Sequence, residues 1–217
     1  MAYGAAMAVC NLLSPGVFAS AALAEPVTVV ALGDSLTAGY GLPVERGLVP
    51  QLQDWLKKQG RDVQIVNAGV SGDTTAGGLA RVDWSLVPET DALIVELGAN
   101  DMLRGLDPGQ AKANLDAILA KAEAKGLPVL VVGIATVRNY GEDYKTQFDA
   151  IYPDLAEKYK AVLYPNLFYP LVAGGADAAT VAPYFQSDGL HPNAKGVGMI
   201  VDGLGPSVLE LLDRVQP

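Results

Sequence analysis

Short, almost wholly apolar runs recur along the chain, and stretches with apolar residues at helical spacing separate them. Runs of this kind are typical of strands that are buried on both faces of a parallel sheet. The predicted strands span 27–32, 63–66, 92–97, 128–135 and 161–163. The predicted helices span 48–58, 108–125, 143–159 and 193–214, and a further helix after the second strand carries Leu79, Val82 and Leu86. A proline is poorly tolerated inside a helix, so we expect a break or shift near Pro153.

Strands and helices alternate from residue 27 to residue 214. Each pair of parallel strands needs a crossover connection, which a helix usually provides, and these crossovers are almost always right-handed. The pattern therefore predicts an α/β fold. We expect a single doubly wound, flavodoxin-like α/β/α sandwich with about five parallel strands in the order 2-1-3-4-5.

Residues 165–190 form the least regular part of the chain. They contain Gly174 and Gly175 together with four aromatic residues, Phe168, Tyr169, Tyr184 and Phe185. Loops of this length inside a compact domain are often functional, so we expect this segment to lie near the functional site.

The first 24 residues differ in composition from the rest, because they contain no Lys, Arg, Asp or Glu. Ala5–Leu13 is a short apolar run, and Ala22-Leu23-Ala24 has the small-x-small form of a signal-peptidase site. We interpret residues 1–24 as a signal peptide and 25–217 as the mature domain of a periplasmic or secreted protein. The alternative is a frayed or membrane-associated amino terminus. A permanent anchor is disfavoured, since polar residues interrupt the run before the roughly 20 apolar residues that a span requires.

Charge and the scarcity of metal-binding residues narrow the function classes. The 217 residues carry a formal net charge of −9, and their Lys and Arg residues form no run, which argues against binding to nucleic acid. Cys10, the only cysteine, lies in the predicted signal peptide, and His191 is the only histidine, so a zinc site is disfavoured. We expect no metal, no cofactor, no stable membrane anchor after cleavage and a monomer. The expected substrate is a small molecule that is uncharged or weakly polar.

Three of the predicted strands end in loops that carry polar side chains. The loops are Gly33-Asp34-Ser35-Leu36, Ser71-Gly72-Asp73 and Gly98-Ala99-Asn100-Asp101. Each alone is typical of a turn or a helix cap. Asp73 or Thr74 can cap the helix that carries Leu79, Val82 and Leu86, and Asn100 or Asp101 can cap a helix after the third strand. Together they lie at one edge of the sheet, beyond which ligands bind in such folds. Ser35 is therefore a candidate nucleophile, which needs a base and donors for the oxyanion.

Asp188-Gly189-Leu190-His191-Pro192 is the candidate source of the base. A lone histidine three residues after an aspartate is more often a surface or core residue than a catalyst. Combined with a serine at the end of a strand, however, it completes a possible Ser-His-Asp set. Histidine is also the side chain best suited to general-base catalysis near neutral pH.

With these motifs in order, the chain resembles the SGNH hydrolase superfamily, also called GDSL-type esterases, over residues 27–192. The resemblance implies that Ser35 is the nucleophile, that Asp188 and His191 complete the triad, and that Ser35, Gly72 and Asn100 form the oxyanion hole. The loop at 71–74, the loop at 97–101 and Ala150-Ile151-Tyr152-Pro153 are most similar to bacterial arylesterases and the periplasmic thioesterase I and lysophospholipase group. This resemblance implies hydrolysis of aryl or acyl esters, and of acyl thioesters or lysophospholipids, without a cofactor.

Two alternatives remain open at this point. A carbohydrate acetylesterase uses the same triad. A non-catalytic or nucleotide-binding α/β module is the alternative from another class, because glycine-rich loops after strands also bind phosphate. Residues 33–37 match neither the Gly-x-Gly-x-x-Gly motif nor the Gly-Lys-Ser/Thr ending of a P-loop, which argues against it.

Overall fold

The structure is a computed structural model, and it describes Met1 and residues 25–136, 138–175 and 177–216. The remainder of the predicted signal peptide, including Cys10, lies outside the described residues. Within them, one parallel sheet has the strand order β2-β1-β3-β4-β5, as predicted from the sequence. The strands are β1 (Val27–Gly33), β2 (Val63–Gly69), β3 (Ala92–Glu96), β4 (Val129–Val132) and β5 (Val162–Tyr164).

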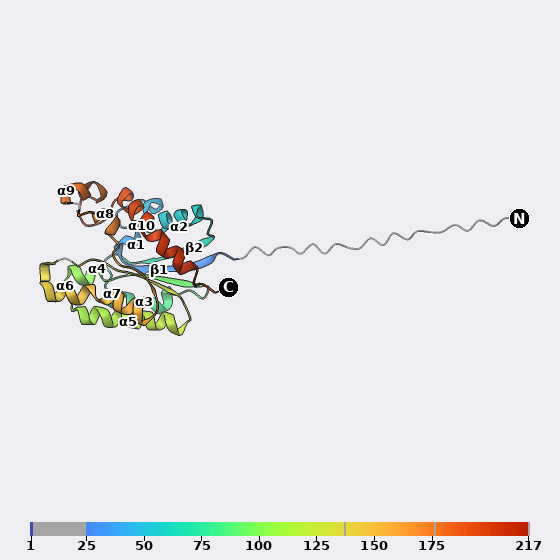
Figure 1. Ribbon diagram of the computed structural model, residues 1–217, viewed down its shortest axis with the longest axis horizontal. Helices are drawn as coiled ribbons and strands as arrows, with labels where there is room; N and C mark the ends of the chain where they lie inside the picture. The colour runs from blue at the N-terminus through green and yellow to red at the C-terminus, as the bar shows by residue number, and fades with distance from the viewer. Residues whose placement is uncertain (2–24, 137, 176, 217) are drawn as a thin grey trace.

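Helices cover both faces of this sheet (Figure 1). One layer contains α1 (Ser35–Ala38), α2 (Leu48–Lys58), α8 (Tyr169–Val172), α9 (Ala178–Val181) and α10 (Ala194–Leu212). The other contains α3 (Thr75–Ser85), α4 (Ala99–Leu103), α5 (Pro108–Ala124), α6 (Glu142–Asp149) and α7 (Ile151–Lys158). Short 3₁₀ turns span Val44–Arg46, Arg138–Tyr140 and Ala182–Tyr184. The predicted α/β/α sandwich is confirmed.

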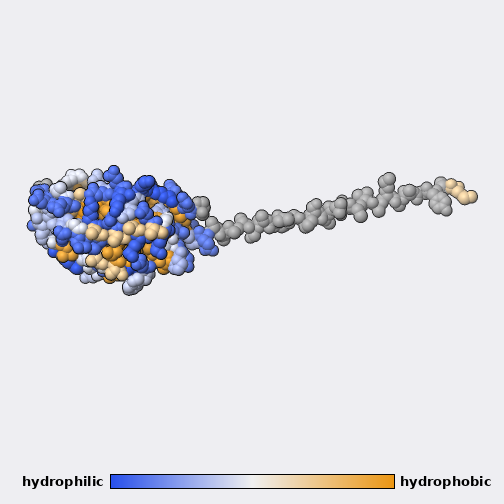
Figure 2. All heavy atoms as spheres, turned by 90° about the horizontal axis from the view of Figure 1, so that it is seen from below, coloured by the Kyte–Doolittle hydropathy of each residue, from blue (hydrophilic) through white to orange (hydrophobic). Residues whose placement is uncertain are grey.

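The central strands form the core. All residues of β3 and β4 are buried, as are those of β1 after Val27. In the edge strand β2, Val63 and Ile65 are buried, whereas its other residues are half-buried or exposed. On the outside, hydrophilic and hydrophobic side chains are mixed over the face shown in Figure 2, as expected for helices that turn a polar face to water. No helix among the described residues combines the length and apolarity needed to cross a membrane.

Several element boundaries differ from the sequence-based expectation. The helix predicted over 143–159 breaks at Ala150 rather than at Pro153, because Pro153 falls in the first turn of α7, where no intrahelical N–H is needed. β4 ends at Val132 instead of continuing to Ala135. There Gly133 donates its N–H to Tyr164 and accepts one from Leu167, beyond the end of β5.

Residues 165–190 contain short helices rather than one irregular loop. The helices α8 and α9 and the turn at Ala182–Tyr184 divide the segment. Because α8 packs against α10, this segment stays on the carboxyl-end side of the sheet. The predicted loop is therefore partly helical.

Candidate active site

Ser35 lies at the sharp turn between β1 and α1. Asp34 caps α1 by accepting the Leu36 N–H at 3.2 Å, which places Ser35 in the first position of the helix. The residue before this turn must be small, since a Cβ on Gly33 would lie 2.0 Å from the hydroxyl oxygen of Thr37. The turn therefore presents Ser35 beyond the carboxyl end of the central strand, as predicted.

The structure brings Ser35, His191 and Asp188 together. Nε2 of His191 lies 2.9 Å from Oγ of Ser35, and Nδ1 of His191 lies 2.7 Å from Oδ2 of Asp188. The other carboxylate oxygen of Asp188 accepts the backbone N–H groups of His191 and Leu190. The hydrogen bonds from His191 and then from Leu190 lower the pKa of Asp188 to about 2. Asp188 is therefore an anion at neutral pH and fixes the orientation of the imidazole.

Residues that no sequence pattern indicated hold the histidine in place. The ring of Tyr40 packs on the imidazole of His191, with 4.6 Å between ring centroids. Gln186 belongs to none of the sequence motifs. Its side-chain amide donates to the backbone carbonyls of Tyr40 and Pro192, and its backbone N–H donates to the backbone carbonyl of His191. Asn193 then caps α10 by accepting the Gly196 N–H. These contacts connect Tyr40, just after α1, to the loop at 186–193 that carries His191.

Gly72 and Asn100 line the same cavity as Ser35. Gly72 has a φ of +83°, a conformation that favours glycine, and its carbonyl accepts from Nη2 of Arg104 at 2.7 Å. Asn100 is not a helix cap, because Gly98 occupies the cap position of α4. Its side-chain amide instead donates to Oδ2 of Asp34 at 3.0 Å.

The expectation that Asp101 caps α4 is wrong. Its carboxylate accepts the backbone N–H of Thr75 at 2.8 Å and the Thr75 hydroxyl at 2.7 Å, so it connects α4 to the start of α3. Of the two caps considered for α3, Thr74 occupies the position and accepts the Gly77 N–H. Asp73 forms an ion pair with Arg81 instead.

A buried pair of carboxyl groups lies beneath the serine. Asp34 is 2% exposed and Glu96 is 3% exposed. Oε2 of Glu96 accepts the Thr37 hydroxyl at 2.7 Å and the Asp34 N–H at 3.4 Å. Burial, and then the nearby charge of Asp34, raise the pKa of Glu96 well above its ordinary value. Burial also raises the pKa of Asp34, but hydrogen bonds from Leu36 and Asn100 oppose the rise. Of the two carboxyl groups, Glu96 therefore has the more strongly raised pKa, and no sequence motif indicated this pair.

A cavity of about 470 Å³ opens over Ser35 and His191. Most of the side chains that line it are apolar, among them Met102, Leu103, Ile134, Phe168, Val172, Phe185 and Leu190. Of the four aromatic residues expected near the site, Phe168 and Phe185 line the cavity, whereas Tyr169 and Tyr184 do not. In the described part of the chain, no group of three or more His, Cys, Asp or Glu side chains is arranged to hold a metal ion.

The model of the GDSL-like Lipase/Acylhydrolase family matches residues 31–198. The chain belongs to this family. It is 40% identical to Esterase TesA of Pseudomonas aeruginosa over 85% of this chain and 89% of that protein. It is 35% identical to an arylesterase of Vibrio mimicus over 89% and 94%, and 34% identical to thioesterase 1/protease 1/lysophospholipase L1 of Escherichia coli K12 over 86% of each chain.

Solved structures agree with the family assignment. The crystal structure of TesA has a TM-score of 0.76 to this fold at 37% identity, and the match covers 85% of this chain and 99% of that one. As a member of the GDSL-like family, this chain is a carboxylic ester hydrolase. The resemblance seen in the sequence motifs is thereby confirmed.

Proposed function

We propose that this GDSL-like hydrolase cleaves acyl and aryl esters by a double displacement at Ser35. The observation that carries the proposal is the continuous hydrogen-bonded chain from Ser35 through His191 to Asp188. Because the Asp188 carboxylate is ionised, it only accepts hydrogen bonds, so the proton of the neutral imidazole lies on Nδ1. Nε2 is then free to accept the hydroxyl proton of Ser35.

Acylation begins when His191 takes that proton and Ser35 Oγ attacks the ester carbonyl carbon. The tetrahedral intermediate collapses as the imidazolium returns the proton to the leaving alcohol, and an acyl-serine remains. Water then attacks the acyl-serine with His191 again as the base, which releases the carboxylic acid and restores Ser35. Asp188 stabilises the imidazolium in both halves of the reaction.

The oxyanion hole consists of the backbone N–H groups of Ser35 and Gly72 and the side-chain amide of Asn100. The bond from Asn100 to Asp34 supports this assignment, because it orients the amide with its nitrogen toward the serine turn. An amide nitrogen has two hydrogens, so one remains for the oxyanion. In hydrolases of this kind, one such donor is worth roughly 3–4 kcal/mol in the transition state.

The mostly apolar cavity favours an apolar acyl or aryl group over a sugar. This argues against the carbohydrate acetylesterase alternative, and the assembled triad argues against a non-catalytic module. The names of the relatives include arylesterase, thioesterase and lysophospholipase. We therefore include acyl thioesters and lysophospholipids among the substrates of this chain.

A substrate panel tests the proposal. Purified 25–217 would be assayed with aryl esters and acyl thioesters of increasing chain length, and with an acetylated sugar. We expect turnover of the aryl esters and thioesters, little turnover of the sugar, and loss of all activities in Ser35→Ala. A preference for the sugar would favour the acetylesterase alternative, and activity retained in Ser35→Ala would exclude Ser35 as the nucleophile.

We also infer that residues 1–24 are a cleaved signal peptide and that the mature enzyme is a periplasmic or secreted monomer. The uncharged segment before Glu25 supports the inference. Mass spectrometry of the exported protein should give Glu25 as the first residue, and sedimentation should give the mass of one chain. An intact Met1 on a cytoplasmic protein would contradict the export, and a dimer would contradict the monomer.

A further inference from the structure

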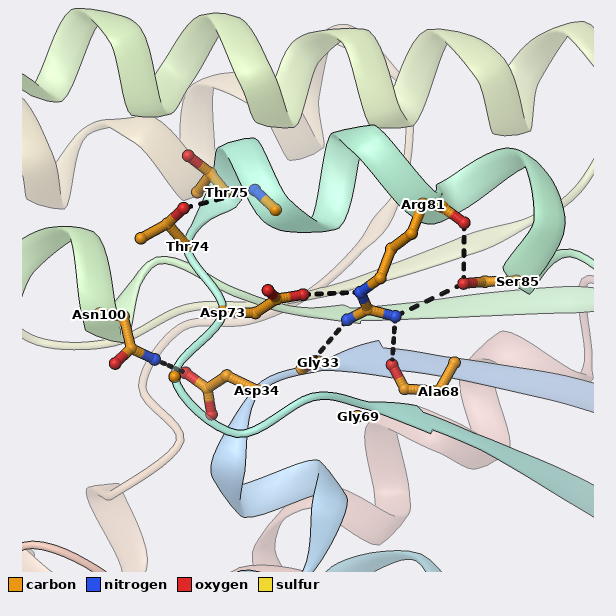
Figure 3. Close-up of polar contacts among 12 residues, drawn as sticks. Gly33, Asp34, Ala68, Gly69, Asp73, Thr74, Thr75, Arg81, Ser85 and Asn100 are labelled. Carbon is orange, nitrogen blue, oxygen red and sulfur yellow. Dashed lines mark hydrogen bonds and ion pairs between the residues drawn. The ribbon is translucent and has the colours of Figure 1, made fainter.

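Arg81 lies against the active-site edge of the sheet without touching the cavity. It is on α3, and 13% of its side chain is exposed. Nε donates to Oδ2 of Asp73 at 2.6 Å, Nη1 donates to the Ala68 carbonyl at 2.7 Å, and Nη2 donates to the Gly33 carbonyl at 2.9 Å (Figure 3). Ser85, one turn later on the same helix, is a further, longer contact of Nη1. The guanidinium therefore joins three separate segments of the chain.

Two of these segments carry the proposed catalytic groups. Gly33 is the last residue of β1 and precedes Ser35 by two positions. Asp73 directly follows Gly72, whose N–H is assigned to the oxyanion hole. The guanidinium is planar and presents its donors in a fixed fork, so it sets the distance and angle between groups bound to its different nitrogens. Arg81 thus connects the nucleophile turn to the loop that presents Gly72.

Other contacts of the loop at 70–74 support this connection. Val70 donates its N–H to the Gly33 carbonyl at 3.0 Å, so this carbonyl accepts hydrogen bonds from both Val70 and Arg81. The Asp73 carboxylate lies close over the first turn of α3, where a Cβ on Gly77 would be 2.4 Å from Oδ1 of Asp73. The ion pair between Arg81 and Asp73 therefore holds the loop against α3. Arg104 holds its outer side at the Gly72 carbonyl.

We propose that Arg81 is a positioning residue for catalysis, which holds the Gly72 N–H at its working distance from Ser35. This inference rests on the proposed function, because it takes Gly72 as an oxyanion donor. Arg81 itself touches no substrate in this scheme. It acts through Asp73 on one side and through the Gly33 carbonyl on the other.

A purely structural role for Arg81 leads to a different expectation. If the guanidinium only stabilises the fold, its replacement lowers the melting temperature, and the folded enzyme keeps its turnover rate. If it positions Gly72, the rate of the folded enzyme falls while substrate binding in the ground state changes little. The ratio of the effects on kcat and KM separates the two roles.

The test compares Arg81→Lys with Val82→Ala, a variant of the next residue on α3. Lysine keeps the charge but not the fork, whereas Val82 is fully buried in the core and has no polar side-chain group that could hold the loop. For Arg81→Lys we expect kcat to fall about 10- to 100-fold with KM within about twofold, since small misplacements of catalytic groups have effects of this size. The rate of reaction with a fluorophosphonate should fall in parallel. Val82→Ala should lower the melting temperature and keep kcat.

An unchanged kcat in Arg81→Lys would overturn the proposal, as would an equal loss of kcat in Val82→Ala assayed well below its melting temperature. If Arg81→Lys does not fold, Asp73→Ala replaces it, because this change frees the loop from Arg81 and leaves the arginine bonds to the strand ends. Retained kcat in Asp73→Ala then overturns the proposal, and a loss like that expected for Arg81→Lys supports it. Failure of the proposed function is distinguishable, because in that case the wild-type enzyme itself is not labelled at Ser35.

Discussion

The two sides of the active site differ in burial and in the range of contacts that hold them. Beneath the serine, Asp34 and Glu96 are 2% and 3% exposed, and they bond to residues about 60 positions away. On the acid-base side, 40% of the Asp188 side chain is exposed, and its bonds reach only Leu190 and His191. The proposed nucleophile and oxyanion donors thus depend on the packing of buried groups. The Asp188 carboxylate forms its hydrogen bonds within one short loop, while Tyr40 and Gln186 support His191 from outside it.

This difference implies that the two sides respond differently to mutation. A change on the buried side alters both the rate and the stability of the fold, because it leaves buried polar groups without partners. A change on the exposed loop alters the rate and leaves stability nearly unchanged. Paired measurements of kcat and melting temperature therefore test the comparison.

The largest effect is expected on the exposed side. His191→Ala removes the base and should lower kcat by about 10⁵- to 10⁶-fold. Asp188→Asn leaves the loop intact but permits the wrong tautomer of His191, and should cost about 10⁴-fold. Both variants should keep the melting temperature of the wild type. Melting far below the wild type would show that this loop supports the fold, which contradicts the comparison.

Asn100→Ala tests the buried side. The loss of one oxyanion donor should lower kcat by about 100- to 1000-fold with little change in KM. Because Asp34 also loses a hydrogen bond in a buried position, the melting temperature should fall as well. Thr75→Val is the matched control, since it removes the buried hydroxyl bonds to Asp101 and Asn114 at a residue that does not line the cavity. A destabilised but fully active Asn100→Ala would remove Asn100 from the oxyanion hole.

The pH dependence of kcat/KM tests whether Asp188 is ionised. Since the pKa of Asp188 is lowered to about 2, Asp188 stays ionised throughout the working range. Protonation of Asp188 should therefore contribute nothing to the acid limb of kcat/KM above pH 4, and this limb should be no steeper than about tenfold for each pH unit. The profile should be measured down to pH 4. A decline with a two-proton slope above pH 4 would mean that a second group of the triad titrates there.

The smallest effect is expected for Glu96→Gln, and on stability rather than on rate. The pKa of Glu96 is raised well above 4.5, so above this pH the unfolded chain releases a proton that the folded chain retains. The free energy of unfolding of the wild type therefore falls as the pH rises until it passes the folded pKa. Glutamine cannot titrate and can still accept from Thr37, so the melting temperature of the variant relative to wild type should increase from pH 5 to pH 8.

Local patterns in the sequence were sufficient to predict the order of the strands in the sheet and the main candidate site residues. The apolar runs of β1, β3 and β4 indicated buried parallel strands, and Ser35 and the Asp188-His191 spacing are visible within a few residues. The structure then places all three side chains in one hydrogen-bonded chain.

Other contacts could not be predicted from any local pattern in the sequence. Arg81 and Gly33 are 48 positions apart, and Asp101 bonds to Thr75 instead of the adjacent helix, because these partners are chosen by the packing of α3 and α4 on the sheet. The same holds for Glu96, whose hydroxyl partner Thr37 is 59 positions away. A buried glutamate at the end of an apolar strand was the one available signal.

The central claim is that Ser35 is the nucleophile activated by His191. Fluorophosphonate labelling of 25–217, followed by mass spectrometry of the intact protein and its peptides, tests it most directly. We expect one phosphonyl group per chain, on the peptide that contains Ser35, with no labelling of Ser35→Ala and very slow labelling of His191→Ala. Labelling at another residue, or an unlabelled wild-type enzyme that still hydrolyses esters, would contradict the account.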